Sequence, residues 1–187
     1  MLILLLLQLE KRLIDLARRE KRTAQIGRTH GQHAVPLTFG FAIASYVSRI
    51  GGRIEKILLH AGELRGKFSG AVGAYNAQSL LVEDQILFEQ EFLAQLGLRP
   101  ADHSTQIVEP EYLADFLHVL TSTFGVLANL ADDMRHLQRS EIDEVMEGFD
   151  NSQVGSSTMP HKRNPVGFEN VKSLYNTFMP RMVSCYQ

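Results

Sequence analysis

The sequence predicts an all-α protein built as a bundle of long helices. Apolar residues recur three and four positions apart over most of the 187 residues, whereas the alternation typical of strands is nearly absent. The strongest pattern, from Glu111 to Gln138, keeps a seven-residue apolar repeat over several heptads. A helix of about 28 residues is about 42 Å long at about 1.5 Å per residue, longer than a compact domain of this size covers alone. We therefore expect it to pack against other long helices, including helices of other subunits.

Residues 1–22 are predicted to form the first helix. Its beginning is apolar on every side, since Leu2 to Leu7 are all aliphatic, and its second half alternates Lys and Arg with apolar residues at helical spacing. The apolar run is too short to span a membrane, which takes about 20 residues. Basic residues follow the run instead of preceding it, as they would in a secretory signal. We therefore expect no membrane contact, and a cover for this helix from outside the chain.

Two more helices are predicted between the first helix and the long one. The first covers residues 37–65, where apolar residues form one stripe that Gly51 and Gly52 interrupt. Glycine costs about 1 kcal/mol inside a helix, so this pair is expected to permit the close approach of another helix. The second covers residues 80–96 and is expected to end at Gly97.

Composition excludes several classes of protein. Nineteen Lys and Arg against 21 Asp and Glu give a net charge of −2, which does not provide the electrostatic attraction of a nucleic-acid binder. Hydrophobic residues make up 44% of the chain, which is too many for intrinsic disorder. The single cysteine, Cys185, excludes an internal disulfide and a cysteine-based zinc cluster. We expect a cytoplasmic protein that binds neither nucleic acid nor membrane.

Three polar loops, of which the first and third contain glycine, are expected between the helices, at residues 27–36, 103–110 and 151–167. In the first loop His30 titrates near neutral pH, so it has the chemistry of a general acid or base. A loop histidine that only hydrogen-bonds locally is the more ordinary interpretation of that residue type. His30 and His33 do not suffice for zinc, which needs three or four ligands. We expect neither a metal nor a cofactor.

The third loop concentrates the groups that anion chemistry needs. Two hydroxyls follow a glycine, and fixed positive charge and an amide come a few residues later. These residues are Gly155, Ser156, Ser157, Lys162, Arg163 and Asn164. Composition alone is equally compatible with a surface loop that binds an occasional phosphate, but the order of the residues is more specific.

That order resembles the signature loop of the fumarase/aspartase superfamily. The run Met159-Pro160-His161-Lys162-Arg163-Asn164-Pro165 is most similar to the adenylosuccinate lyase branch. Four further elements occur in the order typical of this superfamily and extend the resemblance over nearly the whole chain. They are Arg28 to Gln32, Gly66 to Gly73, Ser104 to Gln106, and Glu169 with Asn170.

The resemblance implies a lyase that eliminates fumarate from a succinylated nitrogen, in adenylosuccinate and in the succinylated aminoimidazole carboxamide ribotide of purine biosynthesis. It implies that Ser156 is the base that removes a proton next to a carboxylate. Lys162 and Asn164 match the residues that hold that carboxylate and the charge it gains. His30 matches the general acid that protonates the departing nitrogen, and Glu169 the carboxylate that pairs with this histidine.

Further positions match residues that contact the substrate in the superfamily. Besides Asn164 they are Thr29, Gln106, Ser157 and Asn170. The superfamily also implies a homotetramer around a bundle of long helices, with each active site shared between subunits. Its members are more than twice as long as this chain, so residues 1–187 are expected to form part of the central helical-bundle domain, without the N-terminal and C-terminal domains. We hypothesise that these 187 residues alone are weak or inactive.

Two alternatives remain open at this point. Carboxymuconate cycloisomerases have a closely similar signature loop, so the substrate is less certain than the superfamily. A protein of another class, a non-catalytic helical module that serves oligomerisation, would have the same helices and inherited loops.

Overall fold

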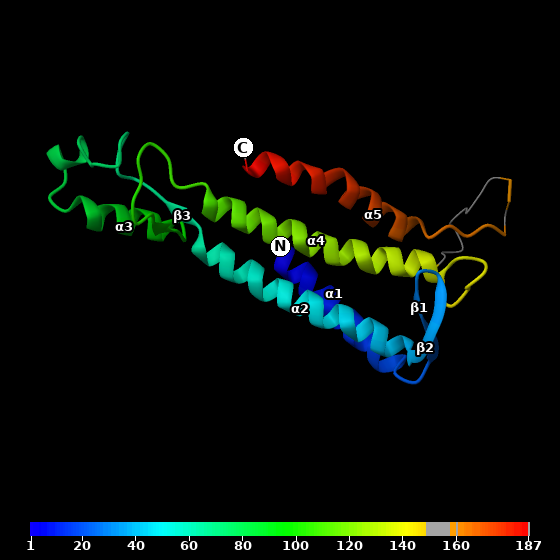
Figure 1. Ribbon diagram of the computed structural model, residues 1–187. Helices are drawn as coiled ribbons and strands as arrows, with labels where there is room; N and C mark the ends of the chain where they lie inside the picture. Colours follow the sequence, from blue (N-terminus) through cyan, green and yellow to red (C-terminus); the bar gives the residue numbers. More distant parts are fainter. Residues whose placement is uncertain (149–157, 160, 187) are drawn as a thin grey trace. The chain divides into compact units, whose positions relative to one another are not determined.

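Helices dominate the computed structural model, which describes residues 1–148, 158–159 and 161–186 (Figure 1). The chain forms two units. Unit 1 comprises Met1–Ile54 and Thr121–Ser184, and unit 2 comprises Glu55–Leu120 and Cys185–Gln187. The predicted all-α class is confirmed.

All four predicted helices form, within a few residues of the expected bounds. In the residues that the structure describes, there is also a fifth α-helix after the signature loop, which the sequence does not predict, and there are two 3-10 helices. The α-helices are α1 (Leu2–Arg19), α2 (Phe39–Glu63), α3 (Gln85–Gln95), α4 (Glu111–Leu137) and α5 (Val166–Phe178). The 3-10 helices are η1 (Gln78–Leu80) and η2 (Met179–Tyr186).

The prediction of a loop at residues 27–36 is wrong, because most of this segment is a β-hairpin. β1 (Ala24–Thr29) pairs antiparallel with β2 (Gln32–Thr38), with an irregularity in register between Ile26 and Arg28. Alternation in sequence reflects a strand with one buried face. In β2 the residues from Gln32 to Pro36 are all exposed, so no buried face imposes that pattern on them.

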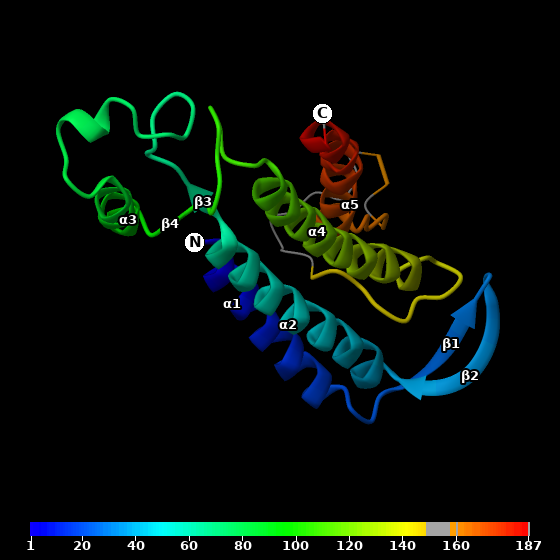
Figure 2. The same ribbon diagram turned by 60° about the vertical axis from the view of Figure 1, so that its left-hand side comes forward.

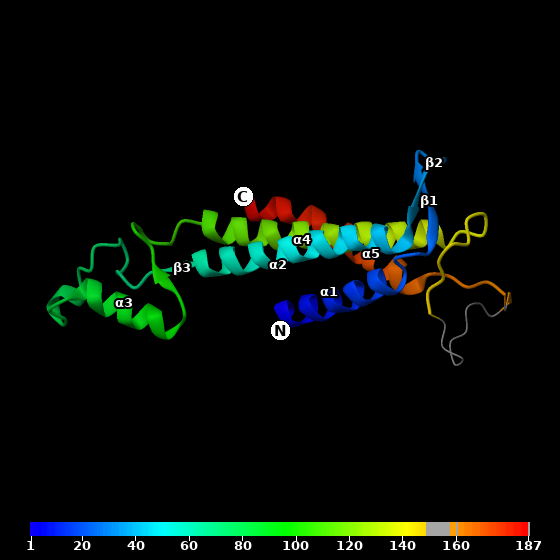
Figure 3. The same ribbon diagram turned by 90° about the horizontal axis from the view of Figure 1, so that it is seen from below.

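The core of unit 1 lies where α1, α2 and α4 pack together, with Ile43 and Ile50 fully buried on α2. Polar contacts join α2 to α4 at helical spacing. Tyr46 donates to Asp133, Arg49 Nη2 donates to Asn129 Oδ1 at 2.7 Å, and Arg53 Nη1 donates to Ser122 Oγ at 3.1 Å. Residue numbers rise on one helix as they fall on the other, so the two helices are antiparallel (Figure 3).

By length and composition α4 is also apolar enough to cross a membrane, with a mean hydropathy of 1.3 in its most apolar window. In this fold the apolar residues of α4 contribute to the core of the bundle. Ala128 and Ala131 are buried at 0% and 2% exposure, and polar side chains of α2 bond along its length. The core helix of a folded bundle has the same composition.

Glycines permit the close approach of α1 and α2, as predicted, but mainly at another position. A Cβ on Gly51 would lie 2.7 Å from Glu10 Oε1 of α1, whereas a Cβ on Gly52 meets nothing within 4 Å. At Gly40 a Cβ would collide with the carbonyl oxygen of Ala17 and lie 2.7 Å from Lys21 N, both main-chain atoms. Gly40 therefore sets the tightest contact between these helices.

Unit 2 is built around α3 and a short parallel pair of strands, β3 (Arg65–Gly66) and β4 (Arg99–Pro100), as Figure 2 shows. The ring of Phe68 packs against Phe92 and Phe88 of α3, with centroids 4.5 and 5.7 Å apart. Aromatic contacts and the strand pair thus hold the loop after β3 against α3.

Candidate active site

His30 occupies the tip of the hairpin, in a turn that few residues tolerate. Thr29 pairs with Gln32, and the two residues between them have positive φ angles, 54° for His30 and 73° for Gly31. A two-residue loop with both φ angles positive is typical of a type I′ turn, which matches the twist of the strands. Glycine adopts this conformation freely, but histidine is strained in it. The turn presents the imidazole at an exposed position.

The carboxylate of Glu144 holds the hairpin through hydrogen bonds to two side chains of β1. Arg28 Nη2 donates to Glu144 Oε1 at 2.6 Å, and Gln25 Nε2 donates to Glu144 Oε2 at 3.1 Å. The hydrogen bond with Arg28 holds the pKa of the Glu144 carboxyl below its ordinary value, and the same bond raises the pKa of Arg28. Both oxygens of Glu144 are therefore committed to the strand that leads to His30.

The same segment, residues 138–148, also contacts the signature loop and the start of α5. Gln138 Nε2 donates to the carbonyl of Arg163 at 3.0 Å, and Glu147 N donates to Gln138 Oε1 at 2.9 Å. The Glu147 carboxylate accepts from Gly167 N at 3.0 and 3.1 Å. An acceptor at a helix N-terminus satisfies N–H groups that the helix leaves unpaired. One segment thus joins the hairpin of His30 to the helix of Glu169.

Positive charge gathers around the signature loop. A cleft of about 720 Å³ in unit 1 lies between the end of α4 and residues 161–165. Its lining includes four cationic residues, one acidic residue and an amide: Arg135, Arg139, Lys162, Arg163, Glu141 and Asn164. Arg139 also lines a second cavity of about 470 Å³ beneath the hairpin, beside Arg28 and Gly31. Such a cleft suits an anion with more than one negative charge.

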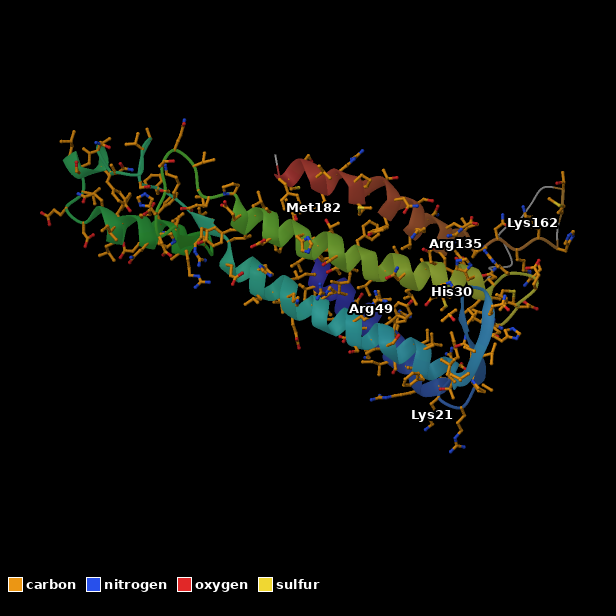
Figure 4. The ribbon with its side chains drawn as sticks, in the orientation of Figure 1. Lys21, His30, Arg49, Arg135, Lys162 and Met182 are labelled. Carbon is orange, nitrogen blue, oxygen red and sulfur yellow. The ribbon has the colours of Figure 1, made fainter. Side chains whose placement is uncertain are left out.

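Lys162 and His30 lie at the same end of unit 1, where α4 ends (Figure 4). Glu169 stands in the first turn of α5, where the helix dipole favours a carboxylate. Within this chain the structure shows no hydrogen bond or ion pair between His30 and Glu169, although both are among the described residues. Ser156 and Ser157 lie outside the described residues.

Gln106 belongs to unit 2, in the loop that precedes α4. Lys67 Nζ donates to the carbonyls of Thr105 and Gln106, which fixes the main chain of this loop. The Gln106 side chain is exposed, as are Thr29, His30, Lys162, Glu169 and Asn170, whereas Asn164 is half-buried. The candidate residues in the described part of the chain are thus presented outward, on surfaces that other chain segments can cover.

Sequence reasoning missed the residues that hold the site together. Arg139, Glu144 and Glu147 follow α4 in a segment without regular structure, and no periodicity marks them. The available signal was the run of acidic residues between two cationic motifs, Arg28 before it and Lys162 with Arg163 after it. Opposite charges on separate motifs indicate contact only once the fold brings them together.

Comparison with known proteins identifies the class to which this helical bundle belongs. A family model described as Lyase matches residues 1–177, so the chain belongs to this lyase family. Its relatives include the adenylosuccinate lyase of Pyrococcus abyssi, 38% identical over 190 residues, covering 95% of this chain and 40% of that protein.

Other relatives carry the same name. The adenylosuccinate lyase of Streptococcus mutans is 39% identical over 174 residues, covering 92% of this chain and 39% of the relative. That of Bacillus subtilis is 37% identical over 172 residues, covering 91% and 38%. The chain thus spans about 40% of the length of these relatives.

Proposed function

We propose that the protein containing this chain is an adenylosuccinate lyase of purine biosynthesis. It eliminates fumarate from adenylosuccinate and from the succinylated aminoimidazole carboxamide ribotide. The name shared by relatives 36–40% identical supports the substrate. The structural observation that carries the proposal is the connection of the His30 hairpin, the signature loop and the start of α5 through residues 138–148. This connection gathers an acid, a cation and a carboxylate at one end of unit 1.

In the proposed reaction Ser156 takes the proton from the carbon next to a carboxylate of the succinyl group. The electrons of that C–H bond move into the carboxylate, and the charge that develops is stabilised by Lys162 and Asn164. These electrons then form the C=C bond of fumarate as the C–N bond breaks. His30 gives its proton to the departing nitrogen. A positive cleft that already contains Lys162 and Asn164 supports these roles.

The active site is proposed to be shared between subunits of a homotetramer. Electrostatic catalysis works best where water is excluded, yet most candidate residues are exposed on this chain. Glu169 is the proposed partner of His30, and the two do not meet within the described part of one chain, so the pair is assigned to two different subunits. Exposed Leu4 and Leu5 of α1, at 64% and 55%, offer apolar surface for the same assembly.

The test follows the absorbance of adenylosuccinate while fumarate is measured, using the longest reading frame that contains these residues. Turnover that is lost in Ser156→Ala and in His30→Ala supports the lyase. A wild-type protein that does not turn over either succinylated nucleotide contradicts it, and turnover of a carboxymuconate diacid identifies the alternative reaction. The 187-residue chain is expected to show little or no activity in the same assay, because it spans only about 40% of the length of its relatives.

A further inference from the structure

In the described part of the chain, the hydrogen bonds of the Lys67 ammonium group all go to main-chain carbonyls of two loops. Its Nζ donates to the carbonyl oxygen of Gly70 at 2.5 Å, to that of Gln106 at 3.1 Å, and to that of Thr105. An ammonium group has three donors and no acceptor, so these carbonyls use its full capacity. Hydrogen bonds from a charged donor are stronger than neutral ones. The ammonium therefore joins the loop after β3 to the loop that carries Gln106.

The backbone segment that follows Lys67 is held in place by Glu89. The carboxylate of Glu89 on α3 is buried at 4% exposure and accepts hydrogen bonds from Phe68 N and, at 2.5 Å, from the Tyr75 hydroxyl. The Glu89 hydrogen bond raises the pKa of Tyr75 to about 12, because the bond favours the protonated phenol. Both ends of the segment from Phe68 to Tyr75 are thereby held by one side chain.

The two loops also touch directly. A Cβ on Gly73, whose φ is +75°, would collide with the carbonyl oxygen of Ser104 and lie 2.9 Å from its carbonyl carbon. The hydroxyls of Ser69 and Ser104 are 3.2 Å apart. Residues 104–106 are therefore held at Ser104 by close packing and at Thr105 and Gln106 by Lys67. Gln106 itself is exposed, so its direction depends on these main-chain contacts.

We propose that Lys67 is a positioning residue that sets the direction of the Gln106 side chain toward the substrate. This inference rests on the proposed function, because the role of Gln106 comes from it. Fixing the carbonyls of residues 105 and 106 fixes the peptide planes on either side of the Gln106 Cα, and hence the line along which its side chain leaves the backbone. A displacement of about 1 Å at a contact with substrate costs up to about a hundredfold in rate.

The experiment compares Lys67→Met, Lys67→Arg and Lys56→Met in the longest reading frame that contains the chain. Lys56 is an exposed lysine of the same unit that makes no hydrogen bond or ion pair in the described part of the chain, so it is the matched control. In Lys67→Met we expect KM for adenylosuccinate to rise about tenfold or more, with a smaller change in kcat. Lys67→Arg keeps the charge and N–H donors and is expected to recover part of the loss, whereas Lys56→Met leaves KM unchanged.

Hydrogen exchange provides a readout that needs no turnover. In Lys67→Met the amides of Gly73 and Tyr75, which donate to the carbonyls of Gly70 and Ser69 beside the Lys67 ammonium group, are expected to exchange faster, while those of α4 keep their protection. An active wild-type enzyme whose KM does not change in Lys67→Met overturns the inference, even if exchange accelerates, because the contact then serves folding alone. Equal KM increases in Lys67→Met and Lys56→Met also overturn it. A wild-type protein without turnover instead overturns the proposed function.

Discussion

Arg28 Nη2 and Glu144 Oε1 lie 2.6 Å apart, and this ion pair connects the hairpin of His30 to the segment before the signature loop. The two side chains are 18% and 25% exposed, so solvent screens the pair less than it would on an open surface. Gln25 bonds the other carboxylate oxygen, which leaves Glu144 little freedom to turn. The position of His30 relative to the signature loop therefore depends on a residue that has no part in the chemistry.

Replacing Glu144 by Gln is expected to lower turnover without unfolding the protein. The amide keeps the size of the side chain but loses the charge that Arg28 pairs with, so the hairpin is held less firmly. We expect kcat to fall about tenfold, since small displacements of a catalytic group cost up to about a hundredfold. The matched control is Glu55→Gln, an exposed residue of α2. Equal kcat values for wild type and Glu144→Gln would contradict the role of the ion pair.

The same carboxylate gives a pH dependence whose sign follows from its pKa. Because the pKa of Glu144 is lowered from 4.5 in the folded protein, its contribution to stability is fully present above about pH 4.5 and is lost as pH falls through the folded pKa. Thermal unfolding midpoints measured from pH 7 to pH 3 are expected to fall further for wild type than for Glu144→Gln. Parallel curves for the two proteins would show that the pair does not contribute.

His30→Asn is expected to raise stability while it abolishes turnover. The φ of 54° at His30 strains an imidazole-bearing residue, whereas Asn followed by Gly is the preferred sequence for a type I′ turn. We expect a gain of up to about 1 kcal/mol in the free energy of unfolding, measured by urea denaturation. A residue kept in a strained conformation that a common substitution relieves is typical of a functional site. Turnover retained by His30→Asn would exclude His30 as the acid.

The helices were predictable because their burial is periodic, whereas the hairpin and α5 were not. On α4 the apolar heptads follow directly from packing against other helices. β2 is exposed from Gln32 to Pro36, and Pro36 is an unusual strand residue, so neither alternation nor propensity marked it. The one local signal was His30-Gly31, a residue pair whose second member suits a type I′ turn.

The same distinction between local and long-range signals applies to the candidate site. His30, Lys162, Asn164 and Glu169 are candidates because their order in the chain matches a family motif, whereas that motif gives no signal for the side chains that hold their segments in place. Glu144 contacts Arg28 across 116 positions, and Lys67 contacts Gln106 across 39. Contacts at such separations are determined by tertiary folding, and no local spacing encodes them.

Two glycines of α2 provide a matched test of how α1 and α2 pack. A Cβ on Gly40 would collide with the main chain of Ala17, which has no flexible end to move aside, whereas a Cβ on Gly52 meets nothing within 4 Å. Gly40→Ala is therefore expected to lower the free energy of unfolding by about 1–3 kcal/mol through overpacking. Gly52→Ala is expected to raise it by about 0.5–1 kcal/mol, because alanine loses less conformational freedom in a helix. Urea midpoints that shift in the same direction for both variants would contradict this close contact between α1 and α2.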